Sequence, residues 1–480
     1  MNQYKNVFLI GIGGIGISAL ARHFLATGLA VSGSDLLDSK ILKELKSEGV
    51  RVKIGHKKAN ISKKIDLVVY NRAIPENNPE LKESQRLGIK TIAYPEAVNE
   101  IADNYKTIAI SGSNGKSTTT AIVSSILINA GYDPTVIVGT RMRELSPLSN
   151  KNYSNYRFGK SKWLVLEADE FGKAFHNYFP YAAIITNIDK EHLDIYKNLN
   201  GVKKSFLKFI SNIQENGILI LNSNDKNLKK LESEIKKITK KKNILIHWYD
   251  TNIHIKSLSN LGLLPSLIGE HNISNATGSF VLAKAIGISD QIIYNSIKKF
   301  SGTWRRMEYR GKCIISNNEF NIYDDYAHHP TEIKATLEAV STLSKLKSSA
   351  VSSSEFKSES VQNPIICVFQ PHQVKRVSSL FEEFVSAFKN VDILILLPIY
   401  RVPGRDSDVT ASETRIMSKK LFTSIKIRNP NIKISYLANP KKLIKSLERL
   451  KLESHQSPIL LMMGAGDIVK FTDNFFNLSK

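Results

Sequence analysis

Short apolar runs along the chain, each followed by glycine or polar residues, indicate an α/β protein. Runs of four or five apolar residues bounded by turn signals are typical of strands buried inside parallel sheets. Longer segments at 18–27 and 118–130 predict helices after two of these strands. Such alternation predicts doubly wound sheets, whose ligands bind at the carboxyl ends of the strands. The expected strands are 6–10, 29–32, 107–110, 163–166, 182–186, 365–369, 393–397 and 459–463.

The length of 480 residues predicts three domains rather than one hydrophobic core. We expect the boundaries to fall at 1–105, 106–301 and 302–480. The serine-rich stretch 344–360 shows no apolar periodicity and is expected to form a flexible surface loop. No apolar run approaches the roughly 18 residues of a membrane span, and the N-terminus does not resemble a signal peptide. With only two cysteines, no disulfide framework or zinc site is expected, which favours the cytoplasm.

The formal charge of +23 comes mostly from lysines scattered along the chain. Local runs such as 236–242 lie in a polar, helix-like stretch and are interpreted as a solvated face that attracts anionic substrates. A polyanion-binding surface is the alternative, but no nucleic-acid-binding motif supports it. Small-molecule substrates, and no nucleic-acid or membrane partner, are therefore expected.

The first candidate site is a glycine-rich turn directly after the strand 6–10. Residues 11–16 read Gly-Ile-Gly-Gly-Ile-Gly, a helical segment follows, and the next strand ends at Asp35. Glycines permit a tight turn and close approach of a phosphate, and the acid is placed to accept hydrogen bonds from a ribose. The pattern predicts nucleotide binding but leaves the nucleotide open, NAD included.

A second turn, residues 111–117, reads Ser-Gly-Ser-Asn-Gly-Lys-Ser between a strand and a helix. Backbone N–H groups of such a loop cradle phosphates, the lysine neutralises the β/γ end, and the last serine hydroxyl holds Mg²⁺. Ile110 stands where the strict phosphate-loop pattern has a glycine. The flanking strand and helix nevertheless favour ATP binding.

Acidic residues follow two further strands of the same region. One strand leads into Glu167-Ala168-Asp169-Glu170, and the next leads into the segment 187–194, which contains His192. Carboxylates at strand ends beside a phosphate loop are the hard oxygen ligands that Mg²⁺ requires. A histidine there is a candidate ligand of a second ion.

The C-terminal third holds the densest polar cluster of the chain, Asp-Asp-Tyr-Ala-His-His-Pro-Thr-Glu at 324–332. Its later strands end at Gln370-Pro371-His372, Pro398-Ile399-Tyr400 and Gly464-Ala465-Gly466-Asp467. Repeated strands ending in polar or glycine residues predict a further doubly wound sheet with ligands at that edge.

Taken together and in this order, the motifs resemble those of the Mur ligases, the synthetases of peptidoglycan precursors. The combination includes GSNGKSTTT at 112–120, EADE at 167–170, DDYAHHPTEI at 324–333 and FQPH at 369–372. The resemblance covers nearly the whole chain and implies a UDP-binding domain, a central ATPase domain and a C-terminal Rossmann-like domain. It implies a cytoplasmic ligase of cell wall synthesis that uses ATP and Mg²⁺.

The resemblance also assigns roles to individual residues. For the UDP of UDP-N-acetylmuramate the matching residues are Gly13, Gly14, Ile15 and Asp35. For ATP they are Gly112, Ser113, Asn114, Gly115, Lys116, Ser117, Thr118, Asn272, Asn275, Arg306 and Asp325. For magnesium they are Ser117, Glu167 and His192, and for the amino acid they are Tyr326, His328, His372 and Arg376.

The implied reaction is phosphorylation of the lactyl carboxylate by ATP, followed by attack of an amine on the acyl phosphate. Lys116 would neutralise charge, His328 would orient the amine or take its proton, and Arg376 would hold the amino-acid carboxylate. We expect L-alanine as the amino acid; glycine and L-serine remain open. A recycling ligase that adds a tripeptide and an NAD-dependent oxidoreductase are the alternatives, and a monomer or weak homodimer is expected.

Three positions depart from the family pattern: Asn114, where a histidine is usual, Arg72, and Gln373, where an arginine is common. They bear on phosphate contact and substrate preference rather than on the type of reaction. Some relatives use a carbamylated lysine; Lys208 lies in the corresponding region but is not assigned that role.

Overall fold

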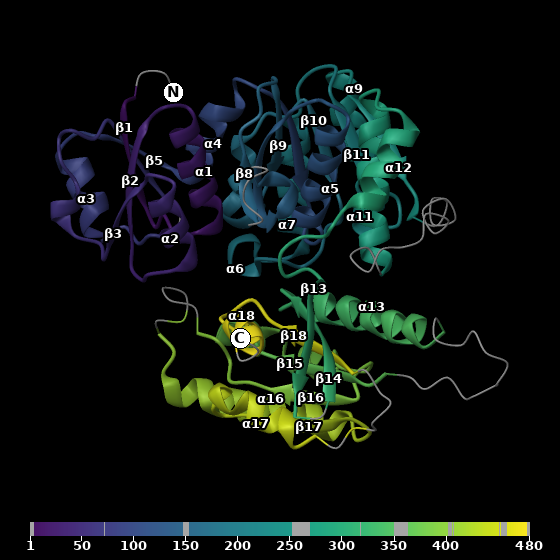
Figure 1. Cartoon of the computed structure of the whole chain (residues 1–480). Coiled ribbons are helices and arrows are strands. Elements are labelled where there is room, and N and C mark those ends of the chain that lie inside the picture. The colour runs from purple at the N-terminus through teal and green to yellow at the C-terminus, as the bar shows by residue number, and fades with distance from the viewer. Residues whose placement is uncertain are drawn as a thin grey trace. The chain divides into compact units, whose positions relative to one another are not determined.

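The computed structural model describes the chain in three parallel or largely parallel sheets, each associated with helices (Figure 1). It describes all residues except 1–3, 72, 147–152, 252–268, 317, 350–362, 402–405, 407, 451, 453–457 and 478–480. The chain divides into two compact units. One comprises Met1–Gly262 with Ile273–Thr303, and the other comprises Leu263–Asn272 with Trp304–Lys480.

The first sheet is fully parallel, with the strand order β3-β2-β1-β4-β5. Alternate residues of β1 face opposite sides: Val7 and Leu9 pack with α1, α2 and α4, whereas Phe8 and Ile10 pack toward α3. Its strands are β1 (Asn6–Ile10), β2 (Ala30–Asp35), β3 (Arg51–Ile54), β4 (Leu67–Tyr70) and β5 (Lys90–Ala93). Its helices are α1 (Ile15–Ala26), α2 (Lys40–Ser47), η1 (Lys58–Asn60), α3 (Pro79–Arg86) and α4 (Tyr94–Ala102).

The central sheet has the order β12-β11-β10-β6-β9-β7-β8, and only its edge strand β8 is antiparallel to its neighbour. Its core includes Phe206 and Phe209 of α7 and also Ala19 of α1, so the first helix packs into the second core. Its strands are β6 (Lys106–Ser111), β7 (Thr135–Met142), β8 (Ser154–Arg157), β9 (Trp163–Glu167), β10 (Ala182–Ile185), β11 (Ile218–Asn222) and β12 (Leu245–Tyr249). Its helices are α5 (Lys116–Asn129), η2 (Arg143–Leu145), η3 (Phe171–Asn177), α6 (Leu193–Tyr196), α7 (Leu199–Ser211), α8 (Lys226–Lys230), α9 (Glu232–Lys241), α11 (Glu270–Ala285) and α12 (Asp290–Lys299).

The third sheet has the order β13-β14-β18-β15-β16-β17 and is parallel apart from the hairpin of β13 and β14. One face is covered by α13 and α16, and the other by α17 and α18. Its strands are β13 (Glu308–Ile315), β14 (Asn318–Asp325), β15 (Ile365–Phe369), β16 (Ile393–Leu396), β17 (Lys433–Tyr436) and β18 (Ile459–Met463). Its helices are α13 (Pro330–Ser349), α14 (Val374–Ser379), α15 (Phe381–Val385), α16 (Ala411–Arg428), η5 (Pro440–Lys442), α17 (Leu443–Glu448) and α18 (Val469–Asn477).

The expected end of the second strand was wrong. The apolar pattern placed it at residue 32, but β2 continues to Asp35 and includes Gly33. A Cβ at Gly33 would lie 2.5 Å from the carbonyl oxygen of Leu9, so the glycine permits close packing of two strands rather than ending one.

The expected loop at 344–360 was wrong at its start, because α13 runs to Ser349. Ile333, Leu337 and Val340 recur at helical spacing and are buried against the third sheet. Ser344 continues that face; it is fully buried and its hydroxyl donates to the carbonyl of Asn363. The remainder of the predicted loop, 350–362, lies outside the described residues, as does Arg72.

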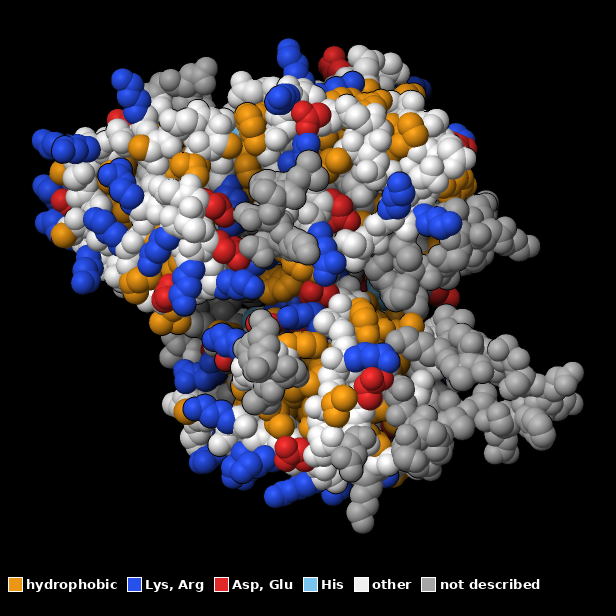
Figure 2. All heavy atoms as spheres, in the orientation of Figure 1, with side chains coloured by type: hydrophobic (Ala, Val, Ile, Leu, Met, Phe, Trp, Pro, Cys, Tyr) orange, Lys and Arg blue, Asp and Glu red, His pale blue; other side chains and the backbone are white. Residues whose placement is uncertain are grey.

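The two cysteines are free and buried. Among the described residues, no helix is both long and apolar enough to cross a membrane. Lysine and arginine side chains are spread over the visible surface of both units (Figure 2).

Candidate active site

The first glycine turn joins β1 to α1 at the carboxyl edge of the first sheet. Gly14 is the N-cap of α1, and no side chain caps this end of the helix. Gly13 N donates to Asp35 Oδ2 at 2.9 Å, and Leu36 N donates to Asp35 Oδ1 at 2.8 Å. The turn and the end of β2 are therefore tied together by one carboxylate, which still has lone pairs to accept a hydrogen bond from a ribose. The four residues predicted here, from Gly13 to Ile15 together with Asp35, meet at this edge.

The helix that follows the first turn is anchored to the central domain by buried polar contacts. Asn155 of β8 is fully buried; its side-chain amide donates to Ile15 O and, at 3.0 Å, to Ser18 Oγ. Arg22 donates to the same Asn155 side chain. Buried polar groups hold a fixed geometry because losing a partner leaves a costly unpaired atom. The first turn is thereby held at a set position on the central domain.

The second glycine turn joins β6 to α5, and two of its glycines have left-handed backbones. A Cβ on Gly112 (φ 143°) would lie 2.0 Å from Thr186 Oγ1, and one on Gly115 (φ 84°) would lie 2.4 Å from Asn275 Oδ1. Asn187, two residues after β10, makes two hydrogen bonds to the backbone of the loop. Its side chain accepts from Asn114 N at 2.9 Å and donates to Asn114 O at 3.0 Å. The loop is thus rigid and leaves no room for side chains at either glycine.

Lys116 is the first residue of α5, and its ammonium group folds back over the loop. Its Nζ donates to Gly112 O at 2.8 Å and to both carboxylate oxygens of Glu170, at 2.7 and 3.0 Å. Burial by itself would lower the pKa of Lys116, but the charges of Glu170, Asp169 and Glu167 outweigh burial and raise it. The lysine is therefore held as a cation at the loop that the sequence predicts to receive phosphates.

Ser117 and Glu167 lie side by side, as expected of two ligands of one ion. The Ser117 hydroxyl donates to Glu167 Oε1 at 2.9 Å, and Gly139 N donates to Glu167 Oε2 at 2.7 Å. Burial raises the pKa of Glu167 despite the attraction of Lys116. A carboxylate and a hydroxyl in contact at the N-terminus of α5 form a donor set that Mg²⁺ accepts.

His192 lies with Asp169 and Glu170, two carboxylates of the strand end expected to serve magnesium, to which the family resemblance had assigned no individual role. One ligand atom each of Asp169, Glu170 and His192 lie within 4.8 Å of one another. His192 has a left-handed backbone (φ 52°), which is a costly conformation in a residue other than glycine. Burial, with repulsion from Asp169, raises the pKa of Glu170. Three carboxylates here face one ammonium group, and this excess of negative charge fits the binding of divalent cations.

The residues expected at the adenine lie on α11. Asn272 and Asn275 are three positions apart and so share a face of the helix; both are buried. Asn275 contacts the phosphate loop at Gly115, as described above. Thr118, in the first turn of α5, is also buried. The structure brings Asn275 to the phosphate loop, whereas Asn272 belongs to the other compact unit.

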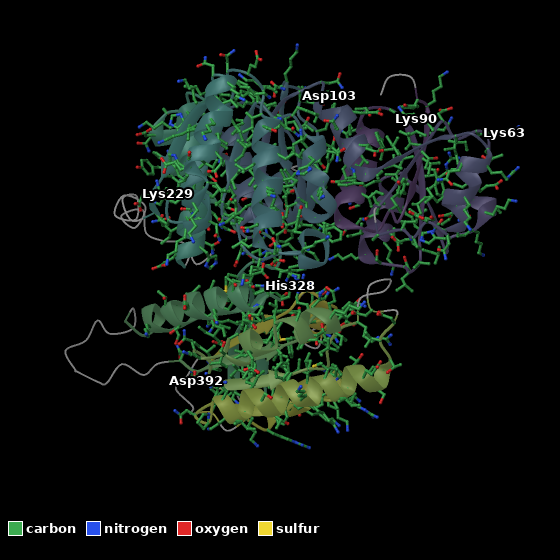
Figure 3. The ribbon with its side chains drawn as sticks, turned by 180° about the vertical axis from the view of Figure 1, so that it is seen from behind. Lys63, Lys90, Asp103, Lys229, His328 and Asp392 are labelled. Atoms are coloured by element: carbon green, nitrogen blue, oxygen red, sulfur yellow. The ribbon has the colours of Figure 1, made fainter. Side chains whose placement is uncertain are left out.

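In the second unit, the predicted amino-acid pocket forms an aromatic cluster at the carboxyl edge of the third sheet. The ring of His328 lies edge-on to Tyr326 and to His372, with centroids 5.3 and 5.5 Å apart. His372 stacks on Tyr400 at 5.6 Å. Figure 3 marks His328, which lies two residues before α13. The structure therefore brings together three of the four residues predicted for this pocket.

The orientation of His328 is set by Glu332. His328 Nδ1 lies 3.1 Å from both Tyr326 O and Glu332 Oε2, which are acceptors, so Nδ1 carries the proton. Burial alone would raise the pKa of Glu332, but the charges of His328 and Arg306 outweigh burial and hold it well below its ordinary value. In the neutral ring, Nε2 then carries the lone pair that can accept a proton.

Arg306 and Asp325 have partners within the second unit. Arg306 Nη1 lies 3.3 Å from Glu332 Oε1 and its guanidinium lies 5.2 Å from the Tyr326 ring. Asp325 is buried and accepts from Met307 N and Ala327 N, both at 2.8 Å. Asp325 thus shapes the turn that carries Arg306, in addition to the role predicted for it at the nucleotide.

Arg376 lies on the short helix α14, half-buried, and no described residue pairs with its guanidinium group. This leaves its planar fork available to a carboxylate. His329, by contrast, is buried and its Nδ1 accepts from Thr331 N, as expected of a structural residue. Lys208 lies exposed on α7.

Three residues of the site were missed by sequence reasoning: Glu170, Asn187 and Glu332. Each lies within a segment that was recognised: EADE at 167–170, the segment 187–194 or DDYAHHPTEI at 324–333. The sequence signal that could have identified them is an acidic or amide residue lying among candidate ligands in the same motif. Lys116 and Glu170, for example, lie more than 50 residues apart in the sequence. No local pattern reveals that they form an ion pair.

Known proteins resemble this chain along nearly its whole length. Family profiles match the chain at residues 6–106 (Mur ligase family, catalytic domain), 110–283 (Mur ligase middle domain) and 305–466 (Mur ligase, glutamate ligase domain). The UDP-N-acetylmuramate–L-alanine ligase of Clostridium tetani is 36% identical, covering 99% of this chain and 98% of that protein. The ligase of the same name from Clostridium acetobutylicum is 34% identical, covering 98% of each chain.

Solved structures share the fold. The UDP-N-acetylmuramate-alanine ligase of Thermotoga maritima superposes with a TM-score of 0.75 at 21% identity, covering 99% of this chain and 100% of that one. A murein peptide ligase from Psychrobacter arcticus gives 0.65 at 19% identity, covering 98% of both chains. Matching relatives and profiles along nearly the full length, together with the motifs and the three sheets, establish that this chain belongs to the Mur ligase family.

Proposed function

We propose that this chain joins L-alanine to the lactyl carboxylate of UDP-N-acetylmuramate, with hydrolysis of ATP to ADP and phosphate. The observation that carries the proposal is the contact of Lys116 with the phosphate loop and with Glu170, which belongs to the cluster of Asp169, Glu170 and His192. The names of the relatives at 34–36% identity support L-alanine as the amino acid. A reaction that consumes ATP and a UDP-linked sugar would run in the cytoplasm.

The first turn would bind the substrate rather than activate it. Its N–H groups and the N-terminus of α1 suit the UDP diphosphate, and Asp35 suits the ribose. Leu36 and Leu37, which follow Asp35, are 57% and 69% exposed and offer an apolar surface for the uracil ring. Because α1 is anchored to β8, we propose that the sugar extends from this turn toward the carboxylate cluster.

The second turn would carry out phosphoryl transfer. The γ-phosphorus–oxygen bond of ATP breaks and a lactyl carboxylate oxygen bonds to phosphorus, which gives an acyl phosphate and ADP. Lys116 would neutralise charge on the transferred group, and loop N–H groups would hold the other phosphates. Ser117 with Glu167, and His192 with its neighbouring carboxylates, would hold Mg²⁺, which supplies further positive charge to the phosphoryl oxygens.

The second unit would supply the amine. Arg376 would hold the carboxylate of L-alanine, and His328 Nε2 would take a proton from the amine as its nitrogen attacks the acyl carbon. The tetrahedral intermediate then expels phosphate and leaves an amide. These residues belong to the second compact unit, and the phosphate loop belongs to the first.

A coupled assay of ADP release tests the proposal. Reactions contain ATP, Mg²⁺ and UDP-N-acetylmuramate, with L-alanine, glycine, L-serine, D-glutamate or the peptidoglycan tripeptide offered in parallel, and blanks omit the UDP-sugar. We expect ADP release with L-alanine and a product one alanyl residue heavier by mass spectrometry. Activity confined to the tripeptide would instead assign the chain to peptide recycling. Absence of turnover with every acceptor would contradict the proposal.

A further inference from the structure

Tyr94 lies beside the helix that follows the first glycine turn and also packs against the core of the central sheet. It follows β5 directly, at the carboxyl edge of the first sheet, and is the first residue of α4. Its ring packs against both the core of the first sheet and the core of the central sheet. Its hydroxyl oxygen lies 3.0 Å from the position that a Cβ on Gly16 would occupy, in the first turn of α1. The hydroxyl therefore stands beside the turn that we propose binds the UDP diphosphate.

The Tyr94 hydroxyl has no partner among the residues that the structure describes, and the side chain is half-buried. A tyrosine hydroxyl at a binding site can donate a hydrogen bond while its ring packs against apolar neighbours. The hydroxyl is therefore available to a molecule bound at the first turn.

The surroundings of Tyr94 favour its protonated form. Burial, and then the charges of Glu167 and Asp169, raise the pKa of Tyr94. At neutral pH the hydroxyl is a donor, and hydrogen bonds from a neutral donor to an anionic oxygen are stronger than those to a neutral one. An anionic group of the substrate is the natural acceptor at this position.

We propose that the Tyr94 hydroxyl donates a hydrogen bond to an anionic oxygen of the UDP-sugar as the substrate passes from the first turn toward the carboxylate cluster. The inference rests on the proposed function for the nature of the ligand. Two groups of the substrate carry such an oxygen, the diphosphate and the lactyl carboxylate. Tyr94 thus becomes a substrate-binding residue that the family motifs quoted above do not contain.

The test compares Tyr94→Phe with Tyr105→Phe. Tyr105 also packs against both cores but lies just before β6, at the amino edge of the central sheet, away from the turns. Binding of UDP and of UDP-N-acetylmuramate is measured by calorimetry for both variants and for the parent chain, together with KM and kcat in the ADP-release assay. We expect Tyr94→Phe to weaken UDP-N-acetylmuramate binding about ten- to a hundredfold and to leave KM for ATP unchanged.

The two ligands identify the acceptor. Weaker binding of both UDP and UDP-N-acetylmuramate would assign the bond to the diphosphate, and weaker binding of UDP-N-acetylmuramate alone would assign it to the lactyl carboxylate. Affinities within twofold of the parent for both ligands would overturn the inference, as would an equal loss in Tyr105→Phe.

The melting temperature of Tyr94→Phe tests whether the hydroxyl bonds to protein instead of substrate. Because the hydroxyl has no described protein partner, Tyr94→Phe is expected to melt within about 2 °C of the parent. A much larger fall would show that the hydroxyl bonds to protein rather than substrate and would also overturn the inference. Failure of the proposed function is separate, since it would show as absent turnover in the parent chain itself.

Discussion

The two glycine turns of the first unit have the same construction and very different surroundings. Each follows a strand of a parallel sheet and leads into the N-terminus of a helix, α1 in one case and α5 in the other. Residues 11–16 carry no charge, and a single carboxylate, Asp35, is bonded to their backbone. The second turn begins its helix with Lys116 and faces Glu167, Asp169 and Glu170. Backbone geometry alone is enough to hold a nucleotide, whereas transfer of a phosphoryl group requires the charges that only the second turn possesses.

The largest effect is expected from Lys116→Ala. Removing the ammonium takes away the charge that stabilises the transferred phosphoryl group, so kcat should fall about a thousandfold or more. Binding of UDP-N-acetylmuramate, measured by calorimetry, should stay within a few-fold of the parent because the first turn is untouched. Lys63→Ala, at the exposed lysine labelled in Figure 3, serves as the control and should behave as the parent. Equal loss of both functions in Lys116→Ala would contradict the division of roles.

Alanine at one glycine of each turn should separate the two binding functions. Gly112→Ala places a Cβ 2.0 Å from Thr186 Oγ1 on a left-handed backbone, so the loop must distort and ATP binding should be largely lost. Gly13→Ala meets the carboxylate of Asp35 at 2.9 Å and makes an ordinary contact with Leu42 at 3.4 Å. It should weaken UDP-N-acetylmuramate binding about tenfold with ATP binding unchanged. Fluorescent ATP-analogue binding and calorimetry with the UDP-sugar measure the two. A loss of ATP affinity in Gly13→Ala would break the comparison.

The anchor between α1 and the central domain should contribute stability rather than chemistry. Asn155→Ala removes the amide that bonds Ile15 O and Ser18 Oγ and leaves buried polar atoms unpaired. We expect the free energy of unfolding to fall by about 1–3 kcal/mol, measured by urea denaturation at pH 7. KM for the UDP-sugar should rise more than KM for ATP, because the anchored helix belongs to the first turn. Unchanged stability would show that the anchor is dispensable.

An effect of similar size is a dependence of stability on pH at the same junction. His23 of α1 is buried with its Nδ1 3.1 Å from the Tyr156 hydroxyl of β8, and burial lowers the pKa of His23 to about 4. Between pH 6.5 and 4 the unfolded chain then binds more protons at this residue than the folded chain, so stability falls as the pH falls. The loss between pH 7 and pH 5 should be about 2 kcal/mol.

The variant His23→Gln isolates this contribution. A glutamine amide can still bond to the Tyr156 hydroxyl but does not titrate, so urea midpoints at pH 7 and pH 5 should differ less than in the parent. Identical differences in parent and variant would exclude His23 as the source.

Much of the site could be predicted because the chemistry lies in short, local motifs at strand ends. Lys116, Ser117 and Glu167 follow directly from their positions after β6 and β9, since parallel strands end at one edge. What could not be predicted depends on tertiary packing. The pairing of Lys116 with Glu170, the control of His328 by Glu332 and the place of Tyr94 join separate segments of the chain.

The secondary structure, too, could be predicted where a local pattern marks it and not where tertiary packing decides. The buried strands β1, β15 and β18 were found to the residue because they are apolar apart from Asn6 at the start of β1. The antiparallel edge strands β8 and β13 were not. Polar residues such as Asn155 and Arg157 interrupt the apolar pattern of β8, and exposed residues interrupt that of β13. α13 was cut short for a related reason, since its end is marked by small polar residues such as Ser344, whose burial only the fold shows.

The most direct test of the account follows one oxygen atom. UDP-N-acetylmuramate labelled with ¹⁸O in its lactyl carboxylate is converted in the presence of ATP, Mg²⁺ and L-alanine, and the released phosphate is analysed by mass spectrometry. If the second turn transfers the γ-phosphoryl group to the carboxylate held by the first, the phosphate carries one ¹⁸O atom from the substrate. Unlabelled phosphate, or label found in AMP, would contradict the acyl phosphate and with it the roles assigned to the two turns.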